Sequence, residues 1–145
     1  MMVCPMRLTD EPAVREIYAA CHPDRPPRPA SWYLAYPTLV LILKRALIGF
    51  TSGSISPGLT GTLTLYGNDL CVLPMYQKRG LGWQLAEARL ALGRAVGAKT
   101  FVGITEVSNT PMSRIFERQG FHACQRLPDY FGAEDGMAWV GPISP

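Results

Sequence analysis

The chain has 145 residues, of which 48% are hydrophobic and 17% charged, and its formal net charge is +3. This length suits one domain with a buried core and is short for two, while the apolar content excludes a disordered chain. The basic excess is small and does not by itself indicate a nucleic-acid partner. We therefore expect a single domain over residues 1–145.

The four cysteines, Cys4, Cys21, Cys71 and Cys124, lie far apart in the sequence. No Cys-x-x-Cys spacing occurs, so the pattern favours neither a zinc site nor a disulfide framework. The N-terminus lacks the basic and apolar regions of a signal peptide, and the longest apolar run, 39–43, is far too short to span a membrane. We expect a soluble cytoplasmic protein without a metal or a membrane partner.

The N-terminal part of the chain predicts a helix followed by a stiff loop. Residues 10–21 carry an early acidic pair, an early proline and apolar residues at helical spacing. Four prolines in residues 22–29 remove backbone donors and exclude a helix interior. A short helix through Trp32 and Tyr33 is expected to follow.

Three strands are expected next. Residues 38–43 and 46–54 are rich in β-formers and read as a pair, and residues 56–61 read as a loop. Residues 62–75 form the next strand. Its segment 67–69, Gly-Asn-Asp, would by itself predict a turn.

The second half of the chain alternates helices and strands. Apolar residues at three- and four-residue spacing predict a helix over 81–96, and a β-rich run predicts a strand over 100–105. A further helix is expected over 110–119, ending at a glycine. Two closing strands, about 121–126 and 137–140, flank the last loop.

The most informative segment joins the strand over 62–75 to the helix over 81–96 and reads Val-Leu-Pro-Met-Tyr-Gln-Lys-Arg-Gly-Leu-Gly-Trp. Gly80 and Gly82 permit tight turns in which successive N–H groups converge on one anion, at the positive end of a helix dipole. Lys78 and Arg79 add positive charge beside it. The segment therefore predicts a site for a phosphorylated cofactor.

Two other phosphate motifs can be compared with this segment. A Walker loop needs Gly-x-x-x-x-Gly-Lys-Ser/Thr, and no such spacing occurs. A dinucleotide fingerprint needs Gly or Ala where Leu85 stands and an acidic residue near 99–104, and the chain has neither. A dinucleotide-binding domain is kept as an alternative.

The segment resembles the acetyl-CoA loop of the Gcn5-related N-acetyltransferase (GNAT) superfamily. The residues that match its pattern are Val72, Pro74, Tyr76, Gln77, Gly80 and Gly82. A second family block resembles the stretch from Asn109 to Gly120 and Phe121. Over residues 6–140 the resemblance implies a three-layer α/β/α fold with a mixed, centrally splayed β-sheet.

The resemblance also implies where acetyl-CoA binds. Its pantetheine arm would pair with the strand edge from Leu70 to Val72, whose amides can polarise the thioester carbonyl. Cys71 then serves in packing and not as a nucleophile. The cofactor-binding residues that we expect are Leu70, Val72, Gln77, Lys78, Arg79, Gly80, Leu81, Gly82, Trp83, Asn109 and Phe116.

The implied reaction is direct attack of a primary amine on the acetyl thioester within a ternary complex. The amine could belong to a small molecule, a peptide terminus or a lysine. Attack requires an acceptor for the amine proton, and the acidic candidates are Asp69 and Glu106. Asp69 has a structural alternative, as a turn or bulge residue bonded to local amides, and Glu106 has one as the cap of the turn into the next helix.

The proton for the leaving thiolate has no obvious donor in the sequence. Phe116 stands where the family usually has a tyrosine, and phenylalanine carries no hydroxyl. Ser113 or Tyr130 could serve instead, water could, or the thiolate could leave unaided. Asn109 also suits a helix cap.

Several alternatives stay open at this stage. The absence of the tyrosine fits a catalytically weak CoA-binding or regulatory module. The residues around the first connection, which in the resembled family helps form the acceptor wall, are His22, Trp32, Tyr33 and Tyr36. Ordinary packing and loop anchoring explain them as well, and an isolated histidine beside a proline is more often a surface residue than a base. A homodimer is a further option, and the identity of the amine is not indicated.

Overall fold

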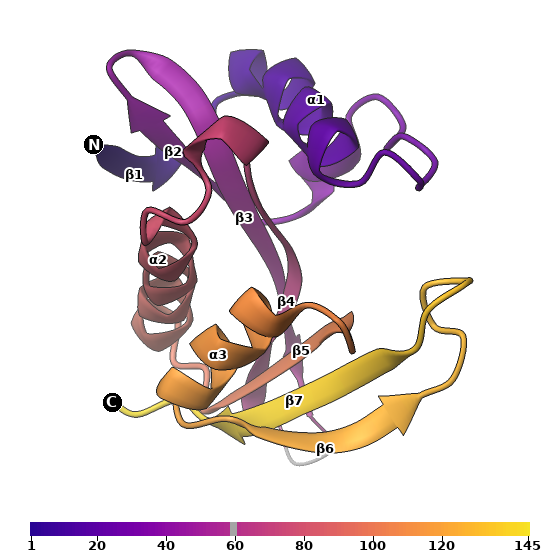
Figure 1. The fold of residues 1–145 in the computed structure, drawn as a ribbon. Coiled ribbons are helices and arrows are strands. Elements are labelled where there is room, and N and C mark those ends of the chain that lie inside the picture. Colours follow the sequence, from indigo (N-terminus) through magenta and orange to yellow (C-terminus); the bar gives the residue numbers. More distant parts are fainter. Residues whose placement is uncertain (59–60) are drawn as a thin grey trace. The chain divides into compact units, whose positions relative to one another are not determined.

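The computed structural model describes residues 1–58 and 61–145, and its helices and strands are labelled in Figure 1. The α-helices are α1 (Glu11–Cys21), α2 (Leu81–Ala95) and α3 (Thr110–Arg118), and short 3-10 turns cover Leu8–Asp10, Trp32–Ala35 and Pro74–Tyr76. All three expected helices and the short turn through Trp32 are confirmed. Their limits agree with the expected ones to within one residue.

The strands form one mixed sheet in the order β1-β2-β3-β4-β5-β7-β6. Their bounds are β1 Met2–Pro5, β2 Thr38–Leu43, β3 Ala46–Pro57, β4 Leu63–Val72, β5 Thr100–Glu106, β6 His122–Leu127 and β7 Gly136–Pro142. The β4–β5 pair is parallel, whereas β1–β2, β2–β3, β5–β7 and β6–β7 are antiparallel. The expected mixed sheet is therefore present.

The largest differences from the expected strands are in β1, β3 and β4, and the limits of β5, β6 and β7 differ by one or two residues. The sequence pattern did not indicate β1, which pairs with β2. β3 continues to Pro57 and therefore includes residues 56 and 57 of the loop expected over 56–61. Residues 59 and 60 of that loop lie outside the described residues. β4 ends at Val72 and not at Met75, because Pro74 cannot donate to a strand ladder and begins a 3-10 turn.

β4 runs without interruption through residues 67–69, as the resemblance implied and the local turn signal did not. Its parallel ladder with β5 runs from Thr64–Thr100 to Gly67–Gly103. β4 then continues for five residues past the last pair, through the residues expected to bind the cofactor.

The described residues form two compact units. Unit 1 comprises Met1–Ser54 and Asp69–Arg89, and unit 2 comprises Ile55–Asn68 and Leu90–Pro145. That the whole chain is one domain remains a prediction. Each unit has its own core and is considered by itself.

In unit 1, helices cover both faces of the strands. Period-two alternation sends neighbouring strand residues to opposite faces, so Cys71 packs in the α1 cluster and Val72 in the α2 cluster. The α1 cluster includes Val14, Ile17, Tyr18, Tyr33, Val40 and Phe50, and the α2 cluster includes Leu41, Ile48 and Leu85. These two layers hold the β4 segment from Asp69 to Val72 between them.

Unit 2 has a core rich in aromatic rings. Phe101 of β5 stacks on Phe121 with ring centroids 4.7 Å apart, and Phe116 of α3 lies 5.6 Å from both Phe101 and Trp139. Leu65 and Leu90 pack in the same cluster. Aromatic pairs at these separations are favourable beyond the area they bury.

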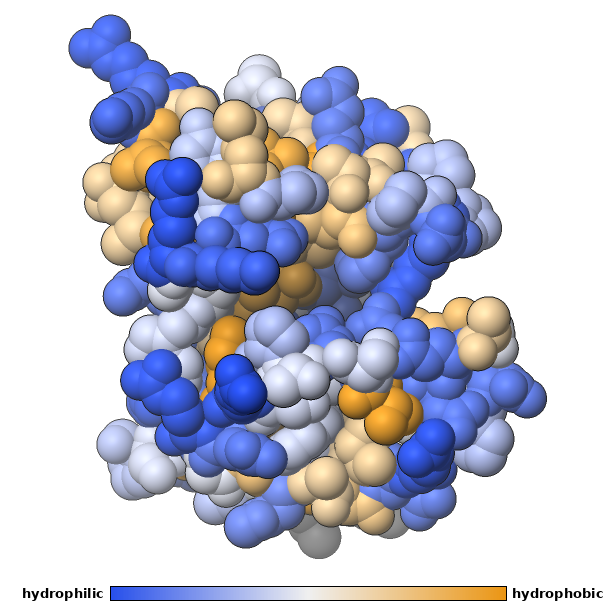
Figure 2. Space-filling view, in the orientation of Figure 1, coloured by the Kyte–Doolittle hydropathy of each residue, from blue (hydrophilic) through white to orange (hydrophobic). Residues whose placement is uncertain are grey.

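Hydrophilic and hydrophobic residues are interspersed on the surface shown in Figure 2. Large apolar side chains that are exposed include Leu8, Met75 and Tyr130, which come from separate parts of the sequence. Single exposed apolar residues are common on folded proteins. Among the described residues, no helix has the length and apolar character needed to cross a membrane.

Candidate functional site

In the loop between β4 and α2, Gly80 has the positive φ of a tight turn, whereas Gly82 lies in the first turn of α2. Lys78 and Gly80 both have positive φ, 62° and 78°. A lysine in this region is uncommon and costs conformational energy, which proteins tolerate mainly where a specific backbone path is needed. Lys78, Arg79 and Gly80 are exposed, and α2 begins directly afterwards.

Side chains of the loop fold back onto its own backbone. The Gln77 amide nitrogen donates to the carbonyl oxygen of Val72 at 2.9 Å, which links the loop to the end of β4. Arg79 donates to the carbonyl of Met75 at 3.4 Å and lies over the Tyr76 ring. Leu81, Gly82 and Trp83 form the first turn of α2 and are half-buried. These contacts within the chain hold the loop in its conformation.

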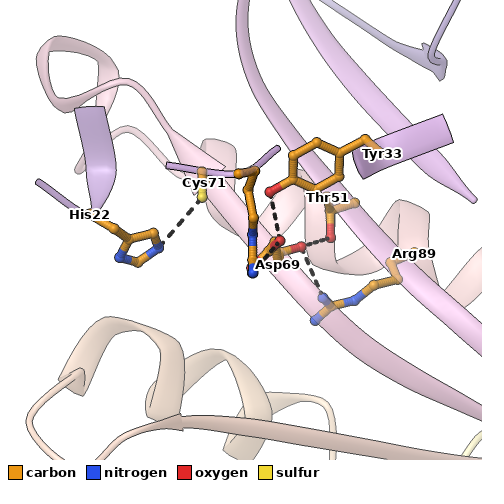
Figure 3. A network of polar contacts seen from close by, with 7 residues as sticks. His22, Tyr33, Thr51, Asp69, Cys71 and Arg89 are labelled. Atoms are coloured by element: carbon orange, nitrogen blue, oxygen red, sulfur yellow. Dashed lines mark hydrogen bonds and ion pairs between the residues drawn. The ribbon is translucent and has the colours of Figure 1, made fainter. Parts of the chain in front are cut away.

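Asp69 lies at the centre of a polar network in unit 1 (Figure 3). Its carboxylate accepts hydrogen bonds from the Tyr33 hydroxyl at 2.7 Å and from the Arg28 guanidinium at 3.2 and 3.3 Å. The Arg28 guanidinium also lies 4.4 Å from the centre of the Tyr18 ring and 4.8 Å from that of Trp32. The network ties the proline-rich loop to β4.

The backbone of Asp69 belongs to the same network. Its carbonyl oxygen accepts from the Thr51 hydroxyl at 2.8 Å and from Arg89 at 3.5 Å. Burial lowers the pKa of Arg89 to about 10, partly offset by the Asp69 charge. Burial and then the Asp69 carboxylate raise the pKa of Tyr33, so its hydroxyl stays protonated and donates.

A second group of contacts surrounds Cys71, two residues further along β4. The His22 ring lies beside it, with Nε2 at 3.8 Å from the Cys71 sulfur, and the Cys21 thiol donates to the Val72 carbonyl at 3.2 Å. A hydrogen bond with Cys21, followed by burial, raises the pKa of Cys71 well above its ordinary value. Cys71 is 2% exposed and remains a thiol, which agrees with a packing role.

Unit 2 brings three predicted residues together at the start of α3. The Asn109 side-chain oxygen accepts from the Met112 N–H at 3.1 Å, which is the N-cap bond expected of it. Its amide nitrogen donates to Glu106 at 3.5 Å. The Ser113 hydroxyl donates to the Asn109 carbonyl at 3.1 Å. Each of these three side chains thus makes a hydrogen bond within the chain.

The remaining predicted residues of unit 2 lie in different surroundings. Phe116 is 3% exposed and packs in the aromatic core, whereas Tyr130 is 54% exposed and contacts Phe131 edge-on. The β4–α2 loop, Asp69 and the Leu70–Val72 edge belong to unit 1, and Glu106, Asn109, Ser113, Phe116 and Tyr130 belong to unit 2. Among the described residues, no group of three potential ligands is arranged for a metal ion.

The sequence did not indicate Arg28, Thr51 or Arg89 as partners of Asp69. They come from a loop, a strand and a helix that are up to 41 residues away from Asp69. No local motif marks them. A buried acidic residue requires a partner, but the burial of Asp69 is itself a consequence of the tertiary fold, so no signal for its cation was present in the sequence.

A family model described as the acetyltransferase (GNAT) family matches residues 11–121. The matched region includes the β4–α2 loop and the Asn109 block. The chain belongs to the acetyltransferase (GNAT) family. No protein of curated description matches the sequence significantly.

Solved structures of this GNAT fold agree with that assignment. The ribosomal-protein-S18-alanine N-acetyltransferase of Escherichia coli superposes with a TM-score of 0.84 at 22% identity, covering 99% of this chain and 94% of its own. The Salmonella typhimurium protein yncA, with its cofactor acetyl-CoA, gives 0.85 at 21%, with 99% and 94% covered. Arabidopsis thaliana Naa50 with a bisubstrate analogue, CoA-Ac-MVNAL, gives 0.83 at 14%, with 97% of each covered. At these identities the likeness shows the fold.

Proposed function

We propose that this GNAT chain transfers the acetyl group of acetyl-CoA to a primary amine by direct attack within a ternary complex. The observation that carries the proposal is the conformation of the β4–α2 loop, with positive φ at Lys78 and Gly80 and exposed cationic side chains at 78 and 79. Backbone N–H groups at such turns and at a helix start favour phosphate oxygens. The CoA structures of the fold relatives support acetyl-CoA as the ligand.

The residues present fit that cofactor. Gln77 to Trp83 would hold the phosphates, and the backbone of Leu70 to Val72 would pair with the pantetheine amides, since β4 continues past its ladder with β5. Asn109 belongs to unit 2, where it orders the start of α3, and it is a further residue proposed to bind the cofactor. The bound cofactor supplies an activated acetyl thioester, whose carbonyl the strand amides would polarise.

The acceptor is proposed to be a primary amine, with peptide N-termini tested first. Two fold relatives support this order: one is described as a ribosomal-protein-S18-alanine N-acetyltransferase, and the other is Naa50 in complex with the bisubstrate analogue CoA-Ac-MVNAL. Lysine side chains and small amines are the other members of the class. Asp69, Glu106, Ser113 and Tyr130 are the candidate groups for moving protons.

The test uses a matched pair of glycine substitutions. Gly80 and Gly97 both have positive φ, 78° and 84°, and an added Cβ would meet nothing within 4 Å at either site. Gly80→Ala and Gly97→Ala should therefore cost about the same stability, roughly 1 kcal/mol, through backbone strain alone. Only Gly80→Ala should also weaken acetyl-CoA binding, by about tenfold or more.

Calorimetric titration with acetyl-CoA, with NADH as a second ligand, measures this difference. Thiol release is then followed with free peptide N-termini, an N-terminally blocked lysine peptide and small amines. Binding with release for one amine class supports the proposal. Binding without release would favour the CoA-binding regulatory module, for which the buried Phe116 ring is the specific observation. No binding of acetyl-CoA would refute the proposed site, and selective NADH binding would favour a dinucleotide domain.

A further inference from the structure

His22 ends α1 and lies against the strand expected to hold the thioester. Its Nε2 is 3.8 Å from the sulfur of Cys71 (Figure 3). Its ring centroid is 4.9 Å from that of Tyr18. Cys71 is the middle residue of the Leu70–Val72 edge, so the imidazole lies beside the segment where an acceptor amine would have to meet the acetyl group. The side chain is half-buried and not enclosed.

Asp69, the acidic candidate on the same strand, is already engaged. One carboxylate oxygen accepts from Arg28 at 3.2 Å, and the other accepts from Tyr33 at 2.7 Å and from Arg28 at 3.3 Å. Its side chain is only 7% exposed. Taking a proton from an amine would require Asp69 to give up a buried ion pair, which is costly.

We propose that His22 is the general base of this acetyltransferase and that Asp69 is a positioning residue that holds the proline-rich loop next to it. This assignment rests on the proposed function. Three observations carry it together. His22 contacts Cys71, both carboxylate oxygens of Asp69 are already hydrogen-bonded, and Cys71 and Asp69 lie on β4, the strand expected to hold the cofactor.

The charges around His22 favour a neutral ring at neutral pH. Burial, and then the positive charges of Arg25 and Arg28, lower the pKa of His22 below its ordinary value of 6.5, while Asp69 acts in the opposite direction. Tyr18 and Cys21 from α1 and Cys71 from β4 complete its surroundings, and the raised pKa of Cys71 keeps that thiol uncharged. A neutral imidazole has one free lone pair, which can accept a proton.

The proton balance of the transfer follows from this assignment. The amine nitrogen forms a bond to the acetyl carbon, the carbon–sulfur bond breaks, and the thiolate leaves with the electron pair. The surplus proton of the amine passes to the imidazole of His22, directly or through one water, and the resulting imidazolium returns it to solvent. No redox partner is needed.

The chain contains only two histidines, which provides a matched control. His22→Gln should lower kcat by roughly 100-fold or more, within the usual range for loss of a general base, and leave acetyl-CoA affinity unchanged. His122→Gln changes an exposed residue of β6 and should keep full activity. His22→Asn serves as a second variant if the glutamine protein is unstable to urea.

The pH dependence separates His22 from the substrate. The rate is measured as a function of pH with two amines of different pKa. An acidic limb of this profile that is due to protonation of the amine shifts with the amine's pKa, whereas an acidic limb due to protonation of His22 stays at the same pH. The fixed acidic limb should be present in the wild type and in His122→Gln and absent from His22→Gln. Proton NMR of the two histidine rings, assigned with the same variants, should give His22 a pKa below 6.5 without any turnover.

The outcomes distinguish the two proposals. An active wild type with an equally active His22→Gln would refute the role of His22 and leave the acetyltransferase intact, as would a fixed acidic limb that His22→Gln retains. A wild type that binds acetyl-CoA and acetylates no amine would refute the proposed function, and with it the role of His22. Loss of activity together with loss of acetyl-CoA affinity in His22→Gln and in His22→Asn would mark a structural residue and also refute the base.

Discussion

At the scale of single residues, the sequence allowed two interpretations of Asp69. An acidic residue on the cofactor strand could act on the amine, or it could satisfy local backbone groups. In the structure its carboxylate binds Arg28 and Tyr33, and its carbonyl binds Thr51 and Arg89. These long-range contacts favour a third reading, in which Asp69 fixes the first connection in place.

We predict that Asp69→Asn destabilises unit 1. The amide keeps the size of the side chain but leaves the Arg28 guanidinium without its counter-ion, at a cost of about 1–3 kcal/mol in the free energy of unfolding. A double-mutant cycle with Arg28→Gln, measured by urea unfolding, should show a coupling of about 1 kcal/mol or more. Additive effects of the two substitutions would show that the ion pair contributes nothing.

We also predict that restoring the family's tyrosine at position 116 will not increase turnover. The Phe116 ring is buried, and its tip lies near Gly103 of β5, where an added Cβ would be 2.9 Å from Phe116 Cζ. Phe116→Tyr would place a hydroxyl in this packed aromatic core and should cost about 1–3 kcal/mol. Urea unfolding and thiol-release assays measure both effects. A stable and faster variant would contradict the prediction and return a proton donor to position 116.

At the scale of single residues, the sequence could indicate local contacts and could not indicate long-range ones. The cap of α3 by Asn109 follows from a local rule, and the structure contains that bond. The pairing of Arg28 with Asp69 and the approach of His22 to Cys71 join residues 41 and 49 positions apart. Such contacts depend on the tertiary fold, and no spacing rule in one sequence specifies them.

At the scale of elements, periodicity was sufficient for the helices and less so for the strands. α1, α2 and α3 each bury one face and start or stop at recognisable residues, which local rules describe. β1 has only four residues and a proline, so its pattern is too short to read. The continuity of β4 through Gly67-Asn68-Asp69 depends on its neighbours, which override a local turn preference.

The start of α1 carries a pH-dependent contact. The Asp10 carboxylate accepts from the Arg7 backbone N–H at 2.9 Å and from the Arg7 side chain at 3.3 Å, and these bonds lower its pKa below the ordinary 3.8. Its contribution to stability is therefore complete above its unfolded pKa and is lost as the pH falls through its lower, folded value.

We predict that Asp10→Asn makes the free energy of unfolding less dependent on pH between about pH 5 and about pH 2. Urea unfolding at several pH values measures the slope. Glu16→Gln is the control, because it removes an exposed carboxylate from the same helix. An unchanged slope in Asp10→Asn would mean that Asp10 titrates alike in the folded and unfolded chains.

At the scale of the whole molecule, the two units share three continuous elements. β3 passes from unit 1 to unit 2 after Ser54, β4 passes from unit 2 to unit 1 after Asn68, and α2 passes back after Arg89. Each boundary falls inside a hydrogen-bonded strand or helix and not in a linker. Ordinary domain boundaries fall in exposed, flexible segments.

We therefore predict that the chain unfolds as one cooperative unit, in agreement with the single domain expected from its length. Loss of either core would break β3, β4 and α2 in the middle, and these elements would lose the packing that stabilises them. Native-state hydrogen exchange should give the most protected amides around Phe50 in unit 1 and Phe101 in unit 2 the same opening free energy, equal to that from urea unfolding. Opening free energies that differ by more than about 2 kcal/mol would instead identify two independently folding units, and each could then be expressed and tested for acetyl-CoA binding by itself.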